Sequence, residues 1–451
     1  MADLYPRIIE RLLAEELLPN FPAVFLVGPR GAGKSTTAGW LGDTVIDLSK
    51  PGPRRAAQDD PDGVLATTSG TVVIDEWQEA PEILTAVKRA VDSDRARTPR
   101  RFIVTGSARA ALGGQTWPGT GRLIRVRMYG LTRSELAHNN AYNPVDTWFA
   151  DRAPTFAASQ VSRAGYIDRI VAGRFPAALR HSGRNLSRWF EAYAEQLAER
   201  DAPQITGSHP RAQLLRGVLR SCAARTGREL NKEAVARDAD VSRATADSHV
   251  RLLEDLSVVA LLPAWHSNRV RRLTRSPRIH LTDAGLATHL LNADAETLTR
   301  DGMLAGQLFE TFVATELLAH IETASTATGL FHYRNRDGHE IDFLLERRGR
   351  VIGLEVKSAT SVGRGDARHL LGLRDRLGAD FHYGAVLYSG QLPYGIDDRI
   401  WALPISTLWE PPIETPVPSS ERGRLLDDLL GRDEHAAYVR SLADDPDLAT
   451  N

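Results

Sequence analysis

The sequence predicts an α/β protein with several domains. A glycine-rich loop follows an apolar run near the N-terminus, and a hairpin pattern of alternating apolar residues occurs far along the chain. The 451 residues also exceed the usual domain length of about 100–200 residues. Hydrophobic residues make up 42% and charged residues 25% of the chain, as in globular proteins. No apolar run approaches the roughly 18 residues of a membrane helix, so we expect a cytoplasmic protein without membrane contact.

The overall charge does not favour nucleic-acid binding over the whole surface. The formal net charge is −1, so any contact with DNA or anionic lipid has to be local. Cys222 is the only cysteine, which excludes an intrachain disulfide. Most basic residues are arginines, and two of the few lysines, Lys34 and Lys357, fall in the two motifs described below. A lysine suits a position that needs a compact, titratable ammonium.

The first motif follows the apolar run AVFLV and precedes an amphipathic pattern. Its glycines let backbone N–H groups surround phosphate oxygens at the positive end of a helix. Lys34 is expected to reach the β- and γ-phosphates, and Ser35 to bind Mg²⁺. The alternative is a glycine turn that binds nothing. We predict a P-loop that binds ATP and Mg²⁺ through Gly28, Pro29, Arg30, Gly31, Ala32, Gly33, Lys34, Ser35 and Thr36.

The second part of this site is predicted at the ends of two further strands. The run TVVID delivers Asp75 and Glu76 to the carboxyl end of a buried strand, where ligands bind in parallel sheets. Asp75 is expected to hold Mg²⁺, and Glu76 to polarise the attacking water. Alone, such a pair is often a solvated loop, but the phosphate loop favours a functional interpretation. A third strand, RFIVTGSA, places Thr105 and Ser107 where they can sense the γ-phosphate.

The runs IDEWQ (74–78) and TGSA (105–108) resemble those of AAA-type (AAA+) ATPases of bacteria and archaea. The resemblance implies a AAA+ parallel sheet over residues 1–150, a helical lid over 151–208, and Ser107 as the sensor residue. It also makes Arg122 an arginine finger acting in a neighbouring subunit, which implies a homo-oligomeric ring, expected to be a hexamer. For Arg122 the alternative is a surface ion pair. A similar resemblance around RWF and ERD makes Arg200 a second candidate for contacting nucleotide or a neighbour.

Residues 209–275 predict a central winged-helix-like domain. In it, Ser242 caps a second helix that carries Arg243 and Arg251. That helix can enter a DNA major groove, or the unit can serve only for packing, and the nearby aspartates weaken the DNA interpretation. A basic segment follows, which either contacts phosphates or is a solvated loop. Its arginines are Arg269, Arg271, Arg272, Arg275 and Arg278.

The second motif, EIDFLLERRGRVIGLEVKSA, predicts a hairpin that turns at residues 348–349. In the register that this turn sets, residue i faces residue 697 − i. Phe343 then faces Leu354 and Leu345 faces Ile352, which gives the apolar face that a buried sheet requires. The register is therefore self-consistent.

Acidic residues meet on the other face of this hairpin. Asp342 falls opposite Glu355, and Glu340 falls opposite Lys357. Paired carboxylates repel one another. A divalent cation between Asp342 and Glu355 would offset the repulsion, with Glu340 engaged by Lys357. Without a metal, one carboxyl should keep its proton to higher pH, and the alternative is an exposed hairpin with a tolerated acidic pair.

The spacing of Asp342, Glu355 and Lys357 resembles the restriction-endonuclease-like PD-(D/E)xK core, which we expect over residues 276–412. By this resemblance the acids bind Mg²⁺, Lys357 positions the water that attacks a phosphodiester, and Glu310 is an acid borne by the preceding helix. Some AAA-type ATPases of unassigned function carry such a C-terminal domain, and such cores also persist as inert scaffolds. Residues 413–451 predict a Pro-rich linker and a helical tail.

Three functions remain open on this basis. The first is an oligomeric ATP-driven machine acting on DNA, with or without Mg²⁺-dependent strand cleavage. The second is a nucleotide-switched regulatory or defence ATPase whose C-terminal domain is a non-catalytic scaffold for DNA or protein. The third is an ATPase with a structural, catalytically dead C-terminal domain.

Overall fold

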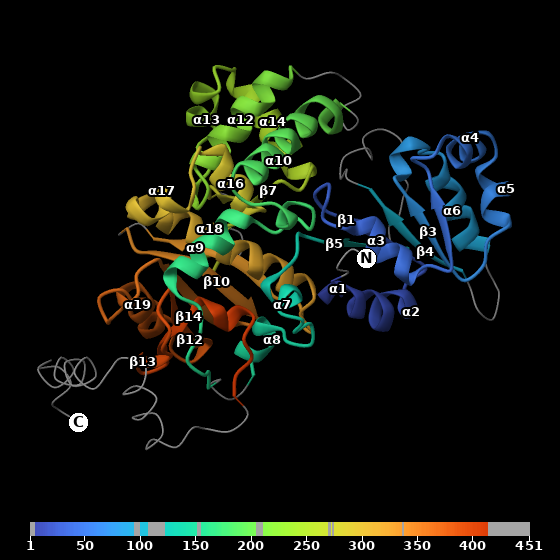
Figure 1. Ribbon diagram of the computed structural model, residues 1–451. Coiled ribbons are helices and arrows are strands. Elements are labelled where there is room, and N and C mark those ends of the chain that lie inside the picture. Colours follow the sequence, from blue (N-terminus) through green and yellow to red (C-terminus); the bar gives the residue numbers. More distant parts are fainter. Residues whose placement is uncertain are drawn as a thin grey trace, which may run out of the picture.

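The computed structural model describes residues 5–93, 100–106, 122–150, 155–203, 211–268, 272, 275–335 and 338–413. These described residues form three β-sheets, which we call the N-terminal, middle and C-terminal sheets. In Figure 1 the N-terminal sheet and its helices stand to one side, and the middle and C-terminal sheets are joined by helices. The predicted tail beyond residue 413 lies outside the described residues.

The N-terminal sheet is parallel, with the strand order β2-β3-β4-β1-β5. Its strands are β1 (Ala23–Val27), β2 (Thr44–Asp47), β3 (Thr71–Asp75), β4 (Arg101–Thr105) and β5 (Leu123–Arg127). Every residue of β1 is buried, as expected where both faces of a parallel sheet are covered. Because β4 lies between β1 and β3, the polar residues that follow β1 and β3 flank the end of β4.

Helices cover both faces of this sheet. One face packs against α4 (Pro51–Asp59), α5 (Pro61–Ala66) and α6 (Ile83–Ser93). The other face packs against α3 (Lys34–Leu41) and an N-terminal helical segment. That segment consists of α1 (Ile8–Arg11), a π-helical turn (Leu12–Leu17) and α2 (Leu18–Asn20). The apolar residues of this segment pack against Val24 and Leu26 of β1, and this burial of apolar surface explains why the segment folds back onto the sheet.

Residues 128–150, which we call the connector, leave β5 and pack against the far end of the chain. The connector contains α7 (Arg133–Leu136) and α8 (Pro144–Trp148). The hydroxyl of Tyr142 donates to the carbonyl oxygen of Thr407 over 2.8 Å, and Asn139 Nδ2 donates to that of Trp409 over 3.0 Å. The end of the predicted ATPase core therefore contacts the predicted C-terminal domain.

A helical region and the middle sheet follow. The helical region contains α9 (Arg163–Ala172), a 3-10 turn (Ala178–Arg180), and α10 (Gly183–Gln196) with its π-helical continuation (Leu197–Asp201). Next come α12 (Ala212–Ala224), β6 (Arg228–Glu229), α13 (Lys232–Asp238), α14 (Arg243–Asp255), β7 (Val259–Leu262) and β8 (Arg278–Leu281). Ser242 caps α14 as predicted, since its Oγ accepts from Thr245 N over 3.1 Å. The antiparallel order β6-β8-β7 carries the middle sheet past the predicted boundary at residue 275.

The C-terminal sheet is mixed, with the order β13-β14-β12-β11-β10-β9. It is preceded by α16 (Ala284–Leu290), α17 (Ala295–Arg300) and α18 (Gly302–Glu322). Its elements are β9 (Gly329–Arg334), β10 (Glu340–Arg347), β11 (Arg350–Lys357), α19 (Arg368–Leu377), β12 (Phe381–Tyr388), β13 (Tyr394–Asp397) and β14 (Ile400–Pro404). Strands β9, β10 and β11 are antiparallel, whereas β12 is parallel to both β11 and β14.

The hairpin of β10 and β11 has the predicted register. Phe343 pairs with Leu354, and Leu345 pairs with Ile352. The turn residues Arg348 and Gly349 have φ values of 52° and 87°. Positive values at both central residues are those of a type I′ turn, which matches the twist of the flanking strands.

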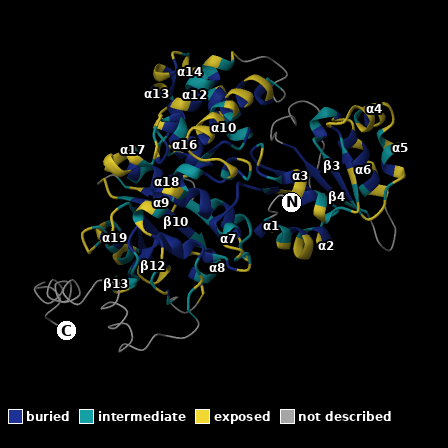
Figure 2. Cartoon of the chain, viewed as in Figure 1, coloured by how far each residue is buried: buried dark blue, intermediate teal, exposed yellow. Residues whose placement is uncertain are grey.

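One apolar core continues through the helical region, the middle sheet and the C-terminal sheet. The N-terminal sheet has apolar clusters of its own on its two faces. Figure 2 shows the buried stretch of α18 among the buried strands of the C-terminal sheet. The continuous core runs across the predicted boundaries at residues 208 and 275.

Candidate functional site

The glycine-rich loop, residues 28–33, joins the end of β1 to the start of α3. Gly33 caps α3 with φ 98°, a left-handed conformation that glycine adopts without strain. A Cβ at Gly28 would lie 1.9 Å from the carbonyl oxygen of Met128 in the connector, so the close approach requires glycine. The loop ends at a helix N-terminus, where free N–H groups and the helix dipole favour an anion.

Lys34 is buried at the start of α3 and is held against the loop. Its Nζ donates to the carbonyl oxygens of Gly28 over 2.8 Å and Pro29 over 2.9 Å. Burial lowers the pKa of Lys34 to about 8, and the nearby carboxylates of Glu76 and Asp75 oppose this shift. A bound phosphate would offer this ammonium a charged acceptor in place of two neutral carbonyls.

Ser35 and Asp75 meet at the carboxyl end of the sheet. Ser35 Oγ, exposed in the first turn of α3, donates to Asp75 Oδ1 over 2.9 Å. Thr105 at the end of β4 also hydrogen-bonds Asp75 Oδ1. Mg²⁺ is commonly held by one or two protein oxygens together with water and substrate phosphates. The side-chain oxygens of Ser35 and Asp75 meet that requirement, so these two residues would hold Mg²⁺ here.

Glu76 follows β3 in a left-handed backbone conformation, with φ 54°. Such a conformation in a non-glycine residue is held by its surroundings and is frequent at functional sites. The carboxylate of Glu76 accepts a hydrogen bond from Gln78 Nε2, which fixes its direction. Ser107, the predicted sensor residue, lies outside the described residues.

Asp201 connects the helical region to the phosphate loop, and sequence reasoning did not identify it. Arg30 in the loop forms a 2.6 Å ion pair with Asp201, whose side chain is 2% exposed. Tyr193 on α10 donates to the carbonyl oxygen of Arg30 over 3.2 Å. The sequence analysis named Arg200, one position earlier, as a candidate for contacting nucleotide or a neighbouring subunit, and it did not foresee the pair of Arg30 and Asp201. Nothing local in the sequence marks this pair, because its members lie 171 residues apart.

Arg7 is a second residue that sequence reasoning missed. Its guanidinium donates to the carbonyl oxygen of Ala32 in the phosphate loop over 2.7 Å and to that of Tyr129 in the connector over 2.8 Å. It also forms a 2.8 Å ion pair with Glu135, and the two side chains are 6% and 0% exposed. Arg7 therefore binds the loop and the connector at once.

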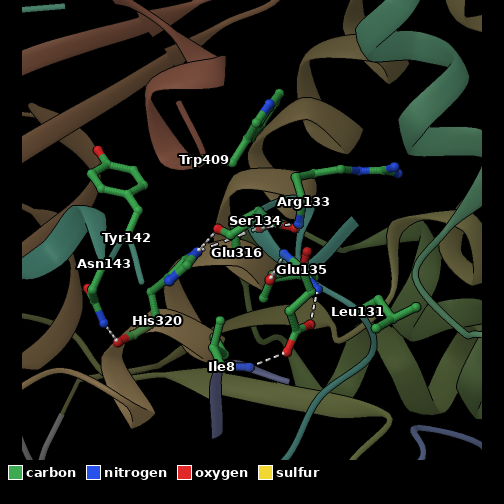
Figure 3. A network of polar contacts seen from close by, with 12 residues as sticks. Ile8, Leu131, Arg133, Ser134, Glu135, Tyr142, Asn143, Glu316, His320 and Trp409 are labelled. Carbon is green, nitrogen blue, oxygen red and sulfur yellow. Dashed lines mark hydrogen bonds and ion pairs between the residues drawn. The ribbon is translucent and has the colours of Figure 1, made fainter. Parts of the chain in front are cut away.

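A polar network joins the connector to α18 (Figure 3). The backbone N–H of Arg133 donates to Glu316 Oε2 over 3.1 Å, and Arg174 Nη1 lies 3.7 Å from Glu316 Oε1. Ser134 Oγ lies 3.1 Å from His320 Nε2. Burial lowers the pKa of His320 to about 3, so the imidazole is neutral at physiological pH. Through these contacts the connector is fixed to the buried helix α18. We call α18 and the C-terminal sheet together the C-terminal unit, and we use N-terminal unit and middle unit in the same way for the other two sheets with the helices that pack on them.

The same helix contributes to a second candidate site, which we call the acidic cluster. It consists of Glu310 on α18, Asp342 on β10 and Glu355 on β11. Asp342 Oδ2 accepts from the backbone N–H of Val356 over 2.9 Å. Burial, reinforced by the charge of Asp342, raises the pKa of both Glu310 and Glu355 well above the usual range. A raised pKa is what two opposed carboxylates should produce.

The expected pairing of Glu340 with Lys357 is wrong. Lys357 Nζ instead lies 3.8 Å from Glu355 Oε2, two positions away on the same strand face. Glu340 is paired with Arg334 over 2.9 Å and with Arg278 over 3.1 Å. Arg278 and Arg334 thus take the place that Lys357 was expected to have beside Glu340. Because Arg278 comes from the middle sheet, the hairpin pattern alone could not predict this.

Arg278 enters the acidic cluster from β8. Its Nη1 lies 3.1 Å from Asp342 Oδ1 and 3.9 Å from Glu310 Oε2. Among the residues that the structure describes, no group of three or more His, Cys, Asp or Glu side chains is arranged to hold a metal ion. In this arrangement the cluster does not fit Mg²⁺, because a guanidinium already binds carboxylates that were predicted as metal ligands.

Cations also stand around the rim of the cluster. Lys357 is 36% exposed, and Arg228 on β6 lies close enough to influence Glu310. His369 Nδ1 lies 3.8 Å from Glu355 Oε1, and its neighbour Arg368 is exposed. The surface at this point therefore carries several positive or ionisable groups above a buried acidic centre.

The predicted DNA-contacting helix has its charges paired within the middle unit. On α14, Arg243 pairs with Glu233 over 3.1 Å and Arg251 pairs with Asp247 over 3.0 Å. Lys232 also pairs with Asp247. These pairs reduce the free positive charge that α14 offers to phosphate.

The basic segment before β8 is also partly engaged. Arg272 pairs with Glu346 over 2.7 Å and stacks on Phe331, with its guanidinium carbon 4.8 Å from the ring centre. Arg275 donates to the carbonyl oxygen of Arg334. Arg269 and Arg271 lie outside the described residues. A freely solvated arginine loop is therefore not what residues 272, 275 and 278 form.

Arg122, the predicted arginine finger, lies immediately before β5. Its Nε donates to Asp92, and the two side chains are 41% and 40% exposed. This is the surface ion pair foreseen as the alternative. Arg200, the second candidate, is exposed on the π-helical turn beside the buried Asp201.

Comparison with known proteins bears on the N-terminal unit most directly. Residues 20–137 match the family described as AAA domain. The N-terminal unit is an AAA-type P-loop ATPase domain. Residues 163–297 and 305–408 match two domains of unknown function, DUF8612 and DUF4143. The AAA domain match thus covers the sheet, the phosphate loop and the start of the connector.

Two mycobacterial proteins resemble most of the chain. They are the uncharacterized proteins Rv2008c of Mycobacterium tuberculosis and Mb2031c of Mycobacterium bovis. Each is 28% identical over 396 residues, which is 86% of this chain and 81% of the relative. The similarity therefore extends over the AAA-type domain and the units that follow it.

Solved structures give weaker similarities. The RuvB Holliday junction branch migration motor from Thermotoga maritima is 16% identical and covers 57% of this chain and 90% of its own, with a TM-score of 0.24. Protein VC1899 from Vibrio cholerae is 10% identical and covers 82% of this chain and 89% of its own, with a TM-score of 0.16. We draw no conclusion about this chain from similarities at these TM-scores. Separately, none of the described helices combines the length and apolarity that crossing a membrane requires.

Proposed function

We propose that this protein is a Mg²⁺-dependent ATPase whose turnover is coupled to DNA held by the middle and C-terminal sheets. The observation that carries the proposal is the polar path from the phosphate loop to α18. Arg7 binds Ala32 of the loop and Glu135 of the connector, and the connector in turn binds Glu316 on α18. The same helix carries Glu310 of the acidic cluster. A change in the loop upon nucleotide turnover thus has a physical route to the C-terminal unit.

The ATPase chemistry follows from the residues at the carboxyl end of the N-terminal sheet. Lys34 would stabilise the charge on the β- and γ-phosphates once it leaves the loop carbonyls. Ser35 and Asp75 would hold Mg²⁺, which when bound neutralises phosphate charge. Glu76, whose direction is fixed by Gln78, would orient the attacking water.

Two features support DNA as the polymer. The order β6-β8-β7 with α12, α13 and α14 is consistent with a winged-helix-like unit, a fold that can place a helix in the major groove. The C-terminal unit, in which β9 to β11 follow α18 and precede α19 and β12, is consistent with a restriction-endonuclease-like core. Lys357 and Arg368 at its rim would bind phosphate, since Lys and Arg contacts to the backbone supply most non-specific affinity.

The proposal is tested by measuring the ATPase rate with single-stranded, duplex and branched DNA. We expect a several-fold stimulation by at least one of these DNAs, and retention of that DNA in a gel-shift assay at low salt. Arg368→Glu should weaken retention of the DNA and make DNA binding less dependent on salt concentration, because the change reverses the charge of a residue that is proposed to bind a DNA phosphate. An ATPase rate that no DNA alters, together with no retention at low salt, would refute the coupling.

Arg122 provides a test of the proposed ring. If this arginine acts in a neighbouring subunit, Arg122→Ala should lower turnover by about 10³-fold or more and leave ATP binding unchanged. Asp92→Ala is the matched control, because it removes the same surface ion pair and keeps the arginine. Equal turnover in the two variants would assign Arg122 to the ion pair alone. The mass of the assembly with and without nucleotide should be measured alongside.

A second candidate function is a nucleotide-switched regulatory ATPase whose C-terminal unit is a non-catalytic scaffold. The observation that favours it is the guanidinium of Arg278 within the acidic cluster. In that case turnover is slow and indifferent to DNA, and nucleotide changes the state of assembly instead. The DNA panel and the mass measurement above distinguish the two functions.

A further inference from the structure

We propose that Arg278 is the resident cation of the acidic cluster and keeps divalent metal ions out of it. This role of Arg278 belongs to the C-terminal sheet and α18, and it does not depend on ATP turnover or DNA binding. Arg278 projects from β8 of the middle sheet, and its guanidinium lies against the carboxylates of Glu310, Glu340 and Asp342.

The backbone of Arg278 is fixed by the middle sheet. Strand β8 lies between β6 and β7, and Arg278 is paired with Glu229 on one side and Leu262 on the other. A residue in a central strand cannot shift without breaking ladder hydrogen bonds on both sides. The side chain therefore projects from a rigid position and is only 6% exposed.

The guanidinium binds carboxylates from two elements of the neighbouring unit. Nη1 lies 3.1 Å from Asp342 Oδ1 and 3.9 Å from Glu310 Oε2. Nη2 lies 3.1 Å from Glu340 Oε2. The fork of an arginine can serve several acceptors at once, which a lysine ammonium or a single water cannot do in the same geometry.

Both oxygens of Asp342 are already in use. Oδ1 faces the guanidinium of Arg278, and Oδ2 accepts from the backbone N–H of Val356. A divalent ion bound by Asp342 and Glu355 would lie beside the guanidinium of Arg278, whose like charge repels it, so the ion could bind well only if Arg278 moved away. Removing that arginine would leave a bare guanidinium-sized space lined by carboxylates, which is the environment that hard cations prefer.

Charge balance explains why the arginine is retained. Buried carboxylates without a partner are strongly destabilising, whereas a paired set is tolerated. Lys357 lies 3.8 Å from Glu355 and supplies charge on the outer side. Arg278 supplies it on the inner side, and it thereby also fastens the middle sheet to the C-terminal sheet.

The test is Mn²⁺ binding to the full-length chain, followed by electron paramagnetic resonance in the absence of nucleotide. The parent chain carries Asp75→Asn, which removes the candidate metal ligand near the phosphate loop. We expect no Mn²⁺ bound at the acidic cluster of this parent. Adding Arg278→Gln should create one site with a dissociation constant of roughly 10⁻⁴–10⁻³ M, and adding Asp342→Asn to that variant should abolish it.

Arg374→Gln is the matched control, because Arg374 also pairs with a carboxylate of the C-terminal unit, that of Asp397 over 2.7 Å, outside the cluster. It should create no Mn²⁺ site. Mn²⁺ binding by the parent that is lost with Asp342→Asn would overturn the proposal, and so would a folded Arg278→Gln chain that gains no site. If Arg278→Gln does not fold, Arg278→Gln with Glu310→Gln removes one acid together with the arginine and is judged by the same gain or absence of Mn²⁺ binding.

Discussion

Replacing Lys34 with alanine is expected to lower ATP turnover by roughly 10²–10³-fold, the loss found when one charge-stabilising donor is removed from an active site. The reason lies in the position of the ammonium. Lys34 is 7% exposed at the start of α3, and its ammonium donates to the neutral carbonyls of Gly28 and Pro29 close to the phosphate loop. The measurement is the steady-state ATPase rate at saturating ATP, with nucleotide affinity determined separately.

Lys50→Ala is the matched control for this change. Lys50 is 69% exposed and pairs with Asp47, so its removal takes away one positive charge without touching the phosphate loop. We expect its turnover to equal that of the unmodified protein. Turnover by Lys34→Ala at that same rate would contradict the assignment of the loop as the hydrolytic site.

Replacing Arg7 with alanine is expected to destabilise the N-terminal unit by about 3–5 kcal/mol, because the change leaves the buried carboxylate of Glu135 without its partner. Glu135 is fully buried, and Arg7 also holds the carbonyl oxygen of Ala32 in the phosphate loop. Two readouts are needed: the midpoint of thermal unfolding, and hydrogen exchange of the amides in residues 28–34. Both the midpoint and the protection of the loop amides should fall.

Two further variants separate this effect from a general loss of charge. Arg11→Ala removes an exposed arginine that pairs with Glu15 on the same helical segment, and should leave the midpoint unchanged. Arg7→Met combined with Glu135→Gln removes both buried charges and should recover part of the lost stability. If the Arg7→Ala and Arg11→Ala variants have the same midpoint of thermal unfolding, the buried pair of Arg7 and Glu135 does not hold the loop.

The features that could be predicted from the sequence are those encoded by neighbouring residues. The phosphate loop is contiguous, and its glycines, lysine and serine imply the geometry that the structure has at Gly33 and Lys34. The register of β10 and β11 follows from alternation of apolar residues around a two-residue turn, and it agrees at Phe343 and Leu345. In both cases the physical cause acts within a short stretch of chain.

The features that could not be predicted depend on contacts between distant parts of the chain. The pairs Arg7–Glu135 and Arg30–Asp201 span 128 and 171 residues. Arg278 belongs by sequence to a basic stretch that suggested contact with phosphates, yet β8 turns it towards Asp342. The pairing of Lys357 was wrong for the same reason, since Arg278 and Arg334 engage Glu340 from other strands.

The apolar core that passes without interruption from α9 and α12 through α18 to β11 and β12 limits how this molecule can be dissected. A cut at residue 208 or 275 would expose the flank of a shared interior on each fragment, and such fragments tend to aggregate rather than fold. By contrast, the N-terminal sheet has apolar clusters that are separate from this shared core. We therefore expect unfolding in two cooperative steps, one for the N-terminal sheet with its helices and one for the region that shares the continuous core. The connector joins these two regions.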